Sequence, residues 1–251
     1  MSKTIAIAGK GGTGKSTIAA LLVQRLCSQD EKPVLAIDAD ADSNLGTLLG
    51  IKEVSSIGNL REDVLEEMKR LPQGMSKAQY VEAGLHNVIY EHDGFDLITM
   101  GKGEGSGCYC YLNSLIRKFS ESLATSYKWM VIDNEAGLEH ISRRTTYHID
   151  ALIVVVTDNP LSLDSARNIQ EITQRMRDRI TKRFIITNMT KKNRLATIKE
   201  KIADLHLEYA CDIPYDETLD EIIYSGESIV SLGSSPVKDV LDSLITRIKD
   251  N

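Results

Sequence analysis

One short segment near the start of the chain constrains the fold more than any other. Residues 9–17 read G-K-G-G-T-G-K-S-T and match the pattern G-x-x-x-x-G-K-[ST] from Gly9 to Ser16. In such a loop the glycines let backbone N–H groups converge on phosphate oxygens, and the following helix N-terminus favours anions. A glycine-rich turn that only resembles the motif is the alternative, although a chance match in a chain this long is on the order of one in a hundred.

The residue types of this loop predict a site for Mg-ATP. Lys15 would neutralise the β- and γ-phosphates, and the hydroxyl of Ser16 would ligate Mg²⁺. The predicted nucleotide contacts come from consecutive residues of the loop and the helix start, namely Gly11, Gly12, Thr13, Gly14, Lys15, Ser16 and Thr17.

Short apolar runs alternate with helical periodicity along most of the chain. The runs predict strands at Ile5–Ala8, Val34–Ile37, Leu97–Met100, Trp129–Ile132, Leu152–Val156 and Phe184–Thr187. The helix-like stretches lie near 15–28, 112–126, 161–178, 193–204 and 236–249. Most runs lack a two-residue alternation, as expected of parallel strands that are covered on both faces. We therefore predict a single α/β domain over residues 1–251 with a doubly wound, mostly parallel sheet, helices on both faces, and a polar, partly helical insertion around 51–94.

Polar residues follow several of these strands, at the sheet edge where ligands bind in such folds. Asp38, Asp40 and Asp42 follow the second strand, and three carboxylates so close together repel one another unless cations such as Mg²⁺ compensate. An acidic turn, with Asp42 capping a helix that starts near Ser43, is the alternative. Asp133 ends another apolar strand, the usual position of an aspartate that holds Mg²⁺ directly or through water.

A glycine-rich segment, 101–107, leads into Cys108-Tyr109-Cys110. Two thiolates two residues apart diverge in a straight strand, but a bent loop can turn both toward one ion. A soft metal prefers four ligands, which a dimer would supply from two such pairs. Two buried cysteines near each other by chance, or a redox pair, are the alternatives, although the redox motif is C-x-x-C. Cys27 and Cys211 are predicted to be core thiols.

The loop contains a lysine in addition to Lys15, namely Lys10. This extra lysine makes the loop resemble the deviant P-loop ATPases that include MinD, ParA and the nitrogenase iron protein. The resemblance implies that Lys10 reaches across a homodimer to the nucleotide of the other subunit, although a solvated surface lysine is the alternative. It also implies that Asp40 orients the attacking water with support from Asp38, and that Asn188 and Pro214 flank the adenine.

The C-Y-C segment, the stretch from Asp133 to His140 and Ile213-Pro214-Tyr215 together resemble the CooC-type nickel-insertion ATPases. Members of that family mature carbon monoxide dehydrogenase, and a close relative serves acetyl-CoA synthase. The resemblance implies that Cys108 and Cys110 bind Ni²⁺, or Zn²⁺ in its place, across a homodimer promoted by ATP and metal. The partner would then be a client nickel enzyme.

The overall charge argues against some other classes. A net charge of −6 does not suit bulk attraction to nucleic acid or anionic lipid. No apolar run approaches the roughly 20 residues of a membrane-spanning helix, and the first apolar run is too short for the apolar region of a signal peptide, so we expect a cytoplasmic protein.

Two rival functions remain open. A ParA- or MinD-like positioning ATPase would need the basic run between Arg175 and Arg183 for DNA, or a basic amphipathic tail for membranes. The last helix has balanced charges and is predicted to pack on the core instead. An iron–sulfur protein would need a further cysteine beyond residue 133, but there is none between Cys110 and Cys211.

Overall fold

A computed structural model describes residues 2–67, 76–101, 125–135 and 148–250. The predicted α/β class is confirmed: within these ranges eight strands form one sheet in the order β3-β4-β2-β5-β1-β6-β7-β8. Neighbouring strands run parallel throughout the sheet except for β3 and β4, which are antiparallel. The strands are β1 (Lys3–Gly9), β2 (Val34–Asp38), β3 (Tyr90–His92), β4 (Phe95–Thr99), β5 (Trp129–Asp133), β6 (Ile149–Val156), β7 (Ile180–Asn188) and β8 (Glu208–Ile213).

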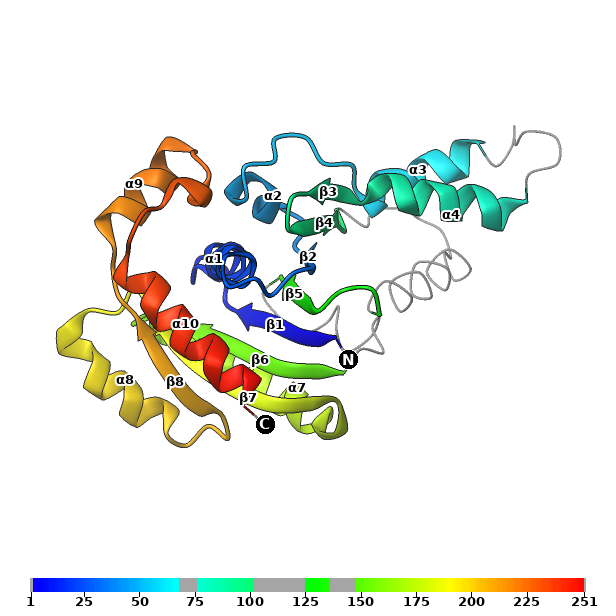
Figure 1. Cartoon of the computed structure of the whole chain (residues 1–251). Coiled ribbons are helices and arrows are strands. Elements are labelled where there is room, and N and C mark those ends of the chain that lie inside the picture. The colour runs from blue at the N-terminus through cyan, green and yellow to red at the C-terminus, as the bar shows by residue number, and fades with distance from the viewer. Residues whose placement is uncertain (1, 68–75, 102–124, 136–147, 251) are drawn as a thin grey trace.

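Helices cover both faces of the sheet, as predicted. On one face α1 (Lys15–Ser28) and α10 (Pro236–Lys249) share a core with the strands, and Figure 1 shows α10 crossing in front of β6 and β7. The other face is covered by α3 (Ile57–Glu67), α4 (Lys77–Val88), α7 (Pro160–Gln174) and α8 (Leu195–Ile202). The short helices α2 (Asn44–Leu48) and α9 (Glu217–Ser225), and the 3-10 turns Arg177–Arg179, Lys192–Arg194 and Ile229–Ser231, complete the described elements.

All the predicted strands are present. Their apolar runs predicted strands that are buried along their whole length, and the structure buries them in this way. In β6 only Asp150 is not fully buried, and its carboxylate accepts a 2.8 Å hydrogen bond from the N–H of Thr4. The strands that the sequence did not predict are the two edge strands: the residues of β3 are exposed and those of β8 are mostly half-buried, so neither strand carries an apolar run.

The helix predictions differ from the structure mainly at their ends. The helix predicted at 161–178 ends at Gln174, and a 3-10 turn at Arg177–Arg179 leads into β7 instead. The helix predicted at 112–126 lies almost wholly outside the described residues. The insertion around 51–94 contains α3, α4 and β3, in agreement with its predicted partly helical character.

The last helix packs on the core, as predicted. Its apolar stripe is buried against α1 and the sheet through Val237, Leu241, Leu244, Ile245 and Ile248. The basic run that could have bound DNA lies around the start of β7, at the opposite edge of the sheet from the glycine-rich loop. No helix among the described residues is long and apolar enough to cross a membrane.

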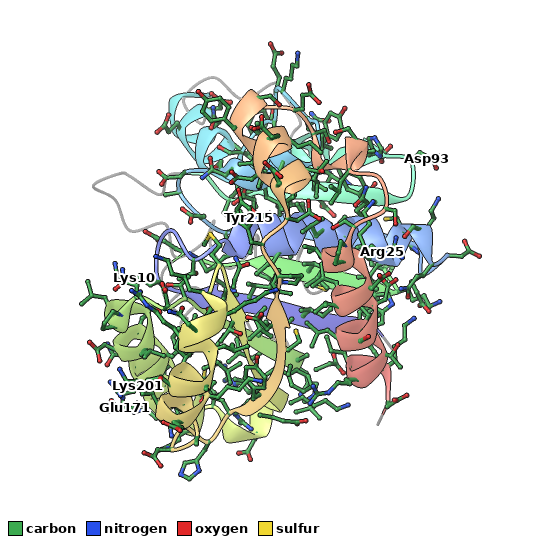
Figure 2. All side chains as sticks on the ribbon, turned by 90° about the vertical axis from the view of Figure 1, so that its left-hand side faces the viewer. Lys10, Arg25, Asp93, Glu171, Lys201 and Tyr215 are labelled. Atoms are coloured by element: carbon green, nitrogen blue, oxygen red, sulfur yellow. The ribbon has the colours of Figure 1, made fainter. Side chains whose placement is uncertain are left out.

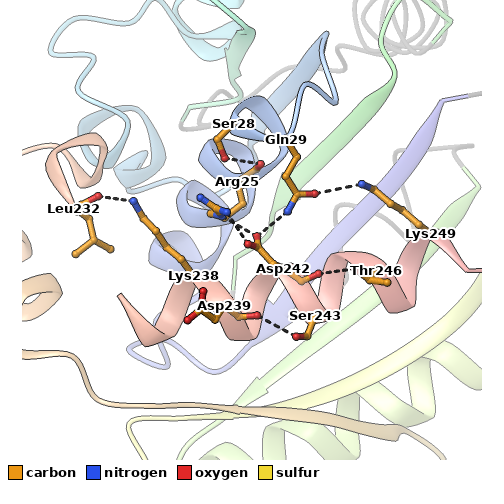
Figure 3. A network of polar contacts seen from close by, with 10 residues as sticks. All are labelled: Arg25, Ser28, Gln29, Leu232, Lys238, Asp239, Asp242, Ser243, Thr246 and Lys249. Atoms are coloured by element: carbon orange, nitrogen blue, oxygen red, sulfur yellow. Dashed lines mark hydrogen bonds and ion pairs between the residues drawn. The ribbon is translucent and has the colours of Figure 1, made fainter. Parts of the chain in front are cut away.

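A polar network joins α1 to α10 beside this core (Figure 3). Arg25 donates two hydrogen bonds to Asp242, from Nε to Oδ1 at 2.7 Å and from Nη2 to Oδ2 at 2.6 Å. Gln29 donates a third to Asp242 Oδ1 at 2.8 Å. The fork of Arg25 matches the carboxylate in two places, and both side chains are less than one-third exposed, so this pair is stronger than an ordinary surface ion pair.

We predict that Asp242→Ala lowers the free energy of unfolding by about 1–2 kcal/mol, because Arg25 and Gln29 both lose their acceptor. Urea denaturation measures the change. The matched control is Asp164→Ala, which breaks the exposed pair with Arg167 on α7 and is expected to change stability by less than about 0.5 kcal/mol. Equal effects of the two substitutions would contradict the prediction.

Candidate nucleotide site

The glycine-rich loop and both acidic loops meet at the carboxyl edge of the central strands. β1 lies between β5 and β6, with Ile7 opposite Asp133 and Gly9 opposite Val155. On the other side of β5, Asp133 lies opposite Asp38 of β2. The sheet register alone therefore brings the first loop and two of the predicted carboxylates together.

The backbone of the loop requires glycine at several positions. Gly12 and Gly14 have φ of 78° and 87°, in the left-handed region that other residues rarely adopt. A Cβ on Gly9 would lie 2.5 Å from the carbonyl oxygen of Val155. Above Gly11 and Gly12, in contrast, an added Cβ would meet no atom within 4 Å. The loop is thus packed against the sheet below and open above, which leaves room for phosphates.

The carbonyl oxygen of Lys10 holds the loop in shape. It accepts hydrogen bonds from the N–H of Thr13 at 3.3 Å, from Thr13 Oγ1 at 2.8 Å and from Lys15 Nζ at 3.4 Å. The Lys15 side chain is buried within the site. The side chain of Lys10, in contrast, forms no hydrogen bond or ion pair with any described residue, and Figure 2 shows it at the periphery of the molecule.

Asp133 is fully buried, and neither of its carboxylate oxygens has a partner of good hydrogen-bond geometry among the described residues. Burial raises the pKa of Asp133 to about 6, although the nearby hydroxyl of Ser16 and the charge of Lys15 oppose the shift. Two unpartnered carboxylate oxygens beside a hydroxyl are hard oxygen donors of the kind that Mg²⁺ prefers. The residues present therefore fit a magnesium ion.

Asp38 is also fully buried, but its oxygens are occupied. Oδ1 accepts from the N–H of Asp40 at 3.2 Å, and Oδ2 accepts from the N–H of Leu45 at 2.9 Å. Burial, followed by the charge of Asp133, raises the pKa of Asp38 to about 7. The alternative in which Asp42 caps the next helix is not borne out: Ser43 is the residue before α2, and the carboxylate of Asp38 accepts a hydrogen bond from the N–H of Leu45 in its first turn.

Asp40 is half-buried and shapes the loop that follows β2. Its Oδ1 accepts from the N–H of Asp42 at 3.0 Å, and its carbonyl oxygen accepts from the N–H of Ser43 at 3.2 Å. This bonding holds the acidic loop as a tight turn next to Asp38. One carboxylate oxygen of Asp40, Oδ2, has no bond to a described residue.

Asn188 lies opposite Ile213 in the β7–β8 register, which places it near Pro214, the residue that follows Ile213. The amide nitrogen of Asn188 donates to the carbonyl oxygen of Thr13 at 2.9 Å, which the sequence did not foresee. One of the two N–H donors of that nitrogen is therefore engaged with the loop, and the second N–H and the amide oxygen remain for a base. Met189, at a φ of 52° and 48% exposed, also borders the loop and was missed because nothing in its sequence context marks it.

The cysteine pair Cys108 and Cys110 lies outside the described residues, but the strand that leads to it is described. The N–H of Met100, directly after β4, donates to the carbonyl oxygen of Asp38 at 2.8 Å. The carbonyl oxygen of Met100 accepts from the N–H of Gly58 at 2.9 Å. Gly101 follows with a φ of 65°, and a Cβ there would collide with Ser56. The glycine-rich segment therefore starts from a fixed point beside the acidic loop.

The other two cysteines agree with the prediction of core thiols. Cys27 and Cys211 are partly buried and pack against the main core cluster. Burial raises the pKa of each thiol to about 11, so both stay protonated and unreactive near neutral pH.

Comparisons with known proteins show the family to which this chain belongs. The family model of the CobQ/CobB/MinD/ParA nucleotide binding domain matches residues 4–229. An uncharacterized ATP-binding protein of Methanocaldococcus jannaschii is 32% identical over 250 residues, which cover 97% of this chain and 98% of that protein. The carbon monoxide dehydrogenase accessory protein CooC of Rhodospirillum rubrum is 32% identical over 185 residues, 68% of each chain.

Solved structures share the fold. A chain of the MinC:MinD cell division protein complex of Aquifex aeolicus has a TM-score of 0.71 at 23% identity, covering 100% of this chain and 97% of that one. A ParA family ATPase from Chlorobium tepidum has a TM-score of 0.70 at 22% identity, with 97% and 99% covered. The chain belongs to the CobQ/CobB/MinD/ParA family and is a P-loop ATPase.

We predict that Asp133→Asn stabilises the protein when nucleotide and magnesium are absent. The folded-state pKa of about 6 lies above the ordinary 3.8, so the charged form costs stability above pH 6, and the cost falls as the pH drops from 6 toward 3.8. Asparagine removes that cost, so the free energy of unfolding at pH 8 should rise by roughly 2 kcal/mol. Urea denaturation at pH 8 and pH 4.5 measures the gain and its decline.

The matched control is Asp42→Asn, a change of the same kind at an exposed position of the neighbouring loop. It should leave stability within about 0.5 kcal/mol of the parent. A gain from Asp133→Asn that is the same at both pH values would contradict the assignment of the effect to a buried charge.

Proposed function

We propose that this ATPase is a dimerising metallochaperone that binds Ni²⁺ through Cys108 and Cys110 and assists its insertion into carbon monoxide dehydrogenase. One observation carries the proposal: β4, fixed to Asp38 through Met100, leads within seven residues of Gly101 to Cys108. A change in the acidic loop would therefore act directly on the start of the cysteine segment. The likeness to CooC over 68% of the chain supports the same function.

The nucleotide site divides the work among its residues. Backbone N–H groups from Gly11 to Gly14 bind the phosphates, Lys15 neutralises them, and Thr17 continues the first helical turn behind them. Ser16 and Asp133 would hold magnesium, which supplies positive charge to the β- and γ-phosphates when bound. Asp40 orients the attacking water.

The supporting residues fix this geometry from the adjacent strands. Asp38 braces the acidic turn through its two backbone hydrogen bonds. Asn188 offers its amide oxygen to the exocyclic amine of adenine, and Pro214 forms an apolar wall beside it.

Lys10 completes the site of the other subunit. Its backbone carbonyl is fixed by three donors while its ammonium is free of any described partner, so the loop presents a cation outward from the site that it builds. A cation supplied across a symmetric dimer acts as an arginine finger does, by neutralising charge that develops at the transferred phosphate. Two protomers drawn together by ATP would also bring together two C-x-C pairs.

We predict that Lys10→Ala binds ATP normally but hydrolyses it at least about a hundredfold more slowly. Asp40→Ala should be inactive for a different reason, since the attacking water in the nucleotide site of the same subunit is no longer oriented. Mixing the two variants makes heterodimers in which one site has both residues, so activity should return to about one quarter of the parent level. Without any recovery on mixing, Lys10 would act within its own subunit.

We predict that Ni²⁺ binds about once per two chains and promotes dimerisation in gel filtration, because four thiolates then surround the metal. Replacing both residues, Cys108→Ser with Cys110→Ser, should abolish binding and the metal-dependent dimer. Cys211→Ser is the matched control and should behave as the parent. A double variant that still dimerises with Ni²⁺ contradicts a bridging site.

The complete function is tested by ATP-dependent activation of an apo-enzyme with Ni²⁺ supplied. Running the assay on carbon monoxide dehydrogenase and on acetyl-CoA synthase separates the proposed client from the alternative one. Activation of neither would favour a positioning ATPase of the ParA or MinD kind, for which the likeness of fold is equally good.

A further inference from the structure

The outer side of α9 combines exposed apolar side chains with acidic ones. Tyr224 is 90% exposed, Ile223 is 40% exposed, and Val230 in the following 3-10 turn is 55% exposed. Leu219 and Ile222 hold the inner side of the helix on the core. The α9 surface consists of these three exposed apolar residues together with Glu217, Asp220, Glu221 and Glu227.

Helical spacing gathers the acidic residues around the aromatic one. Glu217, Asp220, Glu221 and Tyr224 follow one another at i, i+3, i+4 and i+7, so they share one face of α9. The four acidic residues of the α9 surface, which include Glu227, form no ion pair with a described residue. Asp220 accepts one hydrogen bond, of 3.1 Å, from the hydroxyl of Tyr215. Between Lys201 and Lys238 the sequence has eight Asp or Glu residues and no Lys or Arg.

The acidic residues of the α9 surface are not explained by a contribution to the stability of α9. Glu217 and Asp220 lie in the first turn, where acids are favourable, but Glu221 stands four residues after Glu217 and repels it. Glu227 directly follows the C-cap Gly226, at the negative end of a helix whose last turn has no basic residue. These later charges lower the stability of α9, so their explanation lies outside the helix.

The α9 surface lies at the same edge of the sheet as the nucleotide site. α9 begins four residues after Ile213, which is opposite Asn188 in the sheet. Figure 2 shows Tyr215, at the base of α9, on the same side of the molecule as Lys10. A protein docked on α9 would therefore sit beside the bound nucleotide and next to the edge that carries the acidic loop.

We propose that the α9 surface docks a partner protein whose contacting surface is basic and has an apolar pocket for Tyr224. The inference rests on the proposed function, under which this partner is the client enzyme. Complementary charge speeds and orients the encounter, and an exposed tyrosine surrounded by polar groups is the usual anchor of an interface. The same surface on a second copy is disfavoured as the partner, because a two-fold axis through α9 would set acid against acid.

The test uses purified apo carbon monoxide dehydrogenase as the probe and two variants, Glu217→Lys combined with Glu221→Lys, and Tyr224→Ala. Each should weaken binding to the apo-enzyme at least about tenfold, and the binding of the parent should weaken as salt rises. ATPase activity and ATP-dependent dimerisation should be unchanged. The matched control is Glu171→Lys on α7, an exposed charge reversal on the opposite face of the sheet, which should bind as the parent does.

Different failures point to different errors. If the parent and both α9 variants bind the apo-enzyme equally, the docking inference is wrong and the proposed function stands. If the variants lose ATP-dependent dimerisation, the α9 surface meets a second copy, through its exposed Lys191 and Lys192, and the inference is again wrong. If the parent itself neither binds nor activates the apo-enzyme, the proposed function fails, and the inference fails with it.

Discussion

The burial of two carboxylates side by side is the constraint on which the rest of this structure depends. Asp38 and Asp133 occupy paired positions at the ends of β2 and β5, and both are removed from water. The protein satisfies Asp38 with backbone N–H groups from the turn that follows it, and that choice fixes the acidic loop. It leaves Asp133 without a hydrogen-bond partner of good geometry among the described residues, facing Ser16 and Lys15. Positive charge that arrives with a nucleotide, as in the proposed magnesium site, would offset the cost of burying these two carboxylates.

The sequence was sufficient for most of the fold because the central strands are buried on both faces. Six short apolar runs, the first starting at Ile5 and the last at Phe184, predicted six strands. The pattern at residues 9–17 located the nucleotide loop between the first strand and α1. The edge strands β3 and β8 escaped prediction since they are not continuously apolar. Where a helix ends was also beyond the sequence: the periodicity of α7 persists past Gln174, but the chain turns there to enter β7.

The sequence predicted which residues would lie at this edge of the sheet but not how they are bonded. Asp38 was predicted from its position after a strand, and Asn188 from the resemblance. Their bonding could not be: the Asp38 carboxylate caps α2, and the Asn188 amide holds the loop at Thr13. The first contact depends on the exact path of the turn after β2, and the second joins residues that are 175 positions apart in the chain. The Asp38–Met100 contact is of the same kind, since it depends on β2 and β4 being neighbours despite the insertion between them.

The hydrogen bonds to the carbonyl oxygen of Lys10 have a further consequence for how the activity is controlled. They hold the phosphate loop in its working shape within a single subunit, so nucleotide can be taken up before any partner is present. Under the role proposed for Lys10, the side chain of the same residue serves only a neighbouring subunit. ATP binding would then be a property of each molecule, whereas hydrolysis would depend on how often two loaded molecules meet. The rate of hydrolysis per molecule would therefore rise with the concentration of the protein, because scarce copies would hold ATP while crowded copies would consume it.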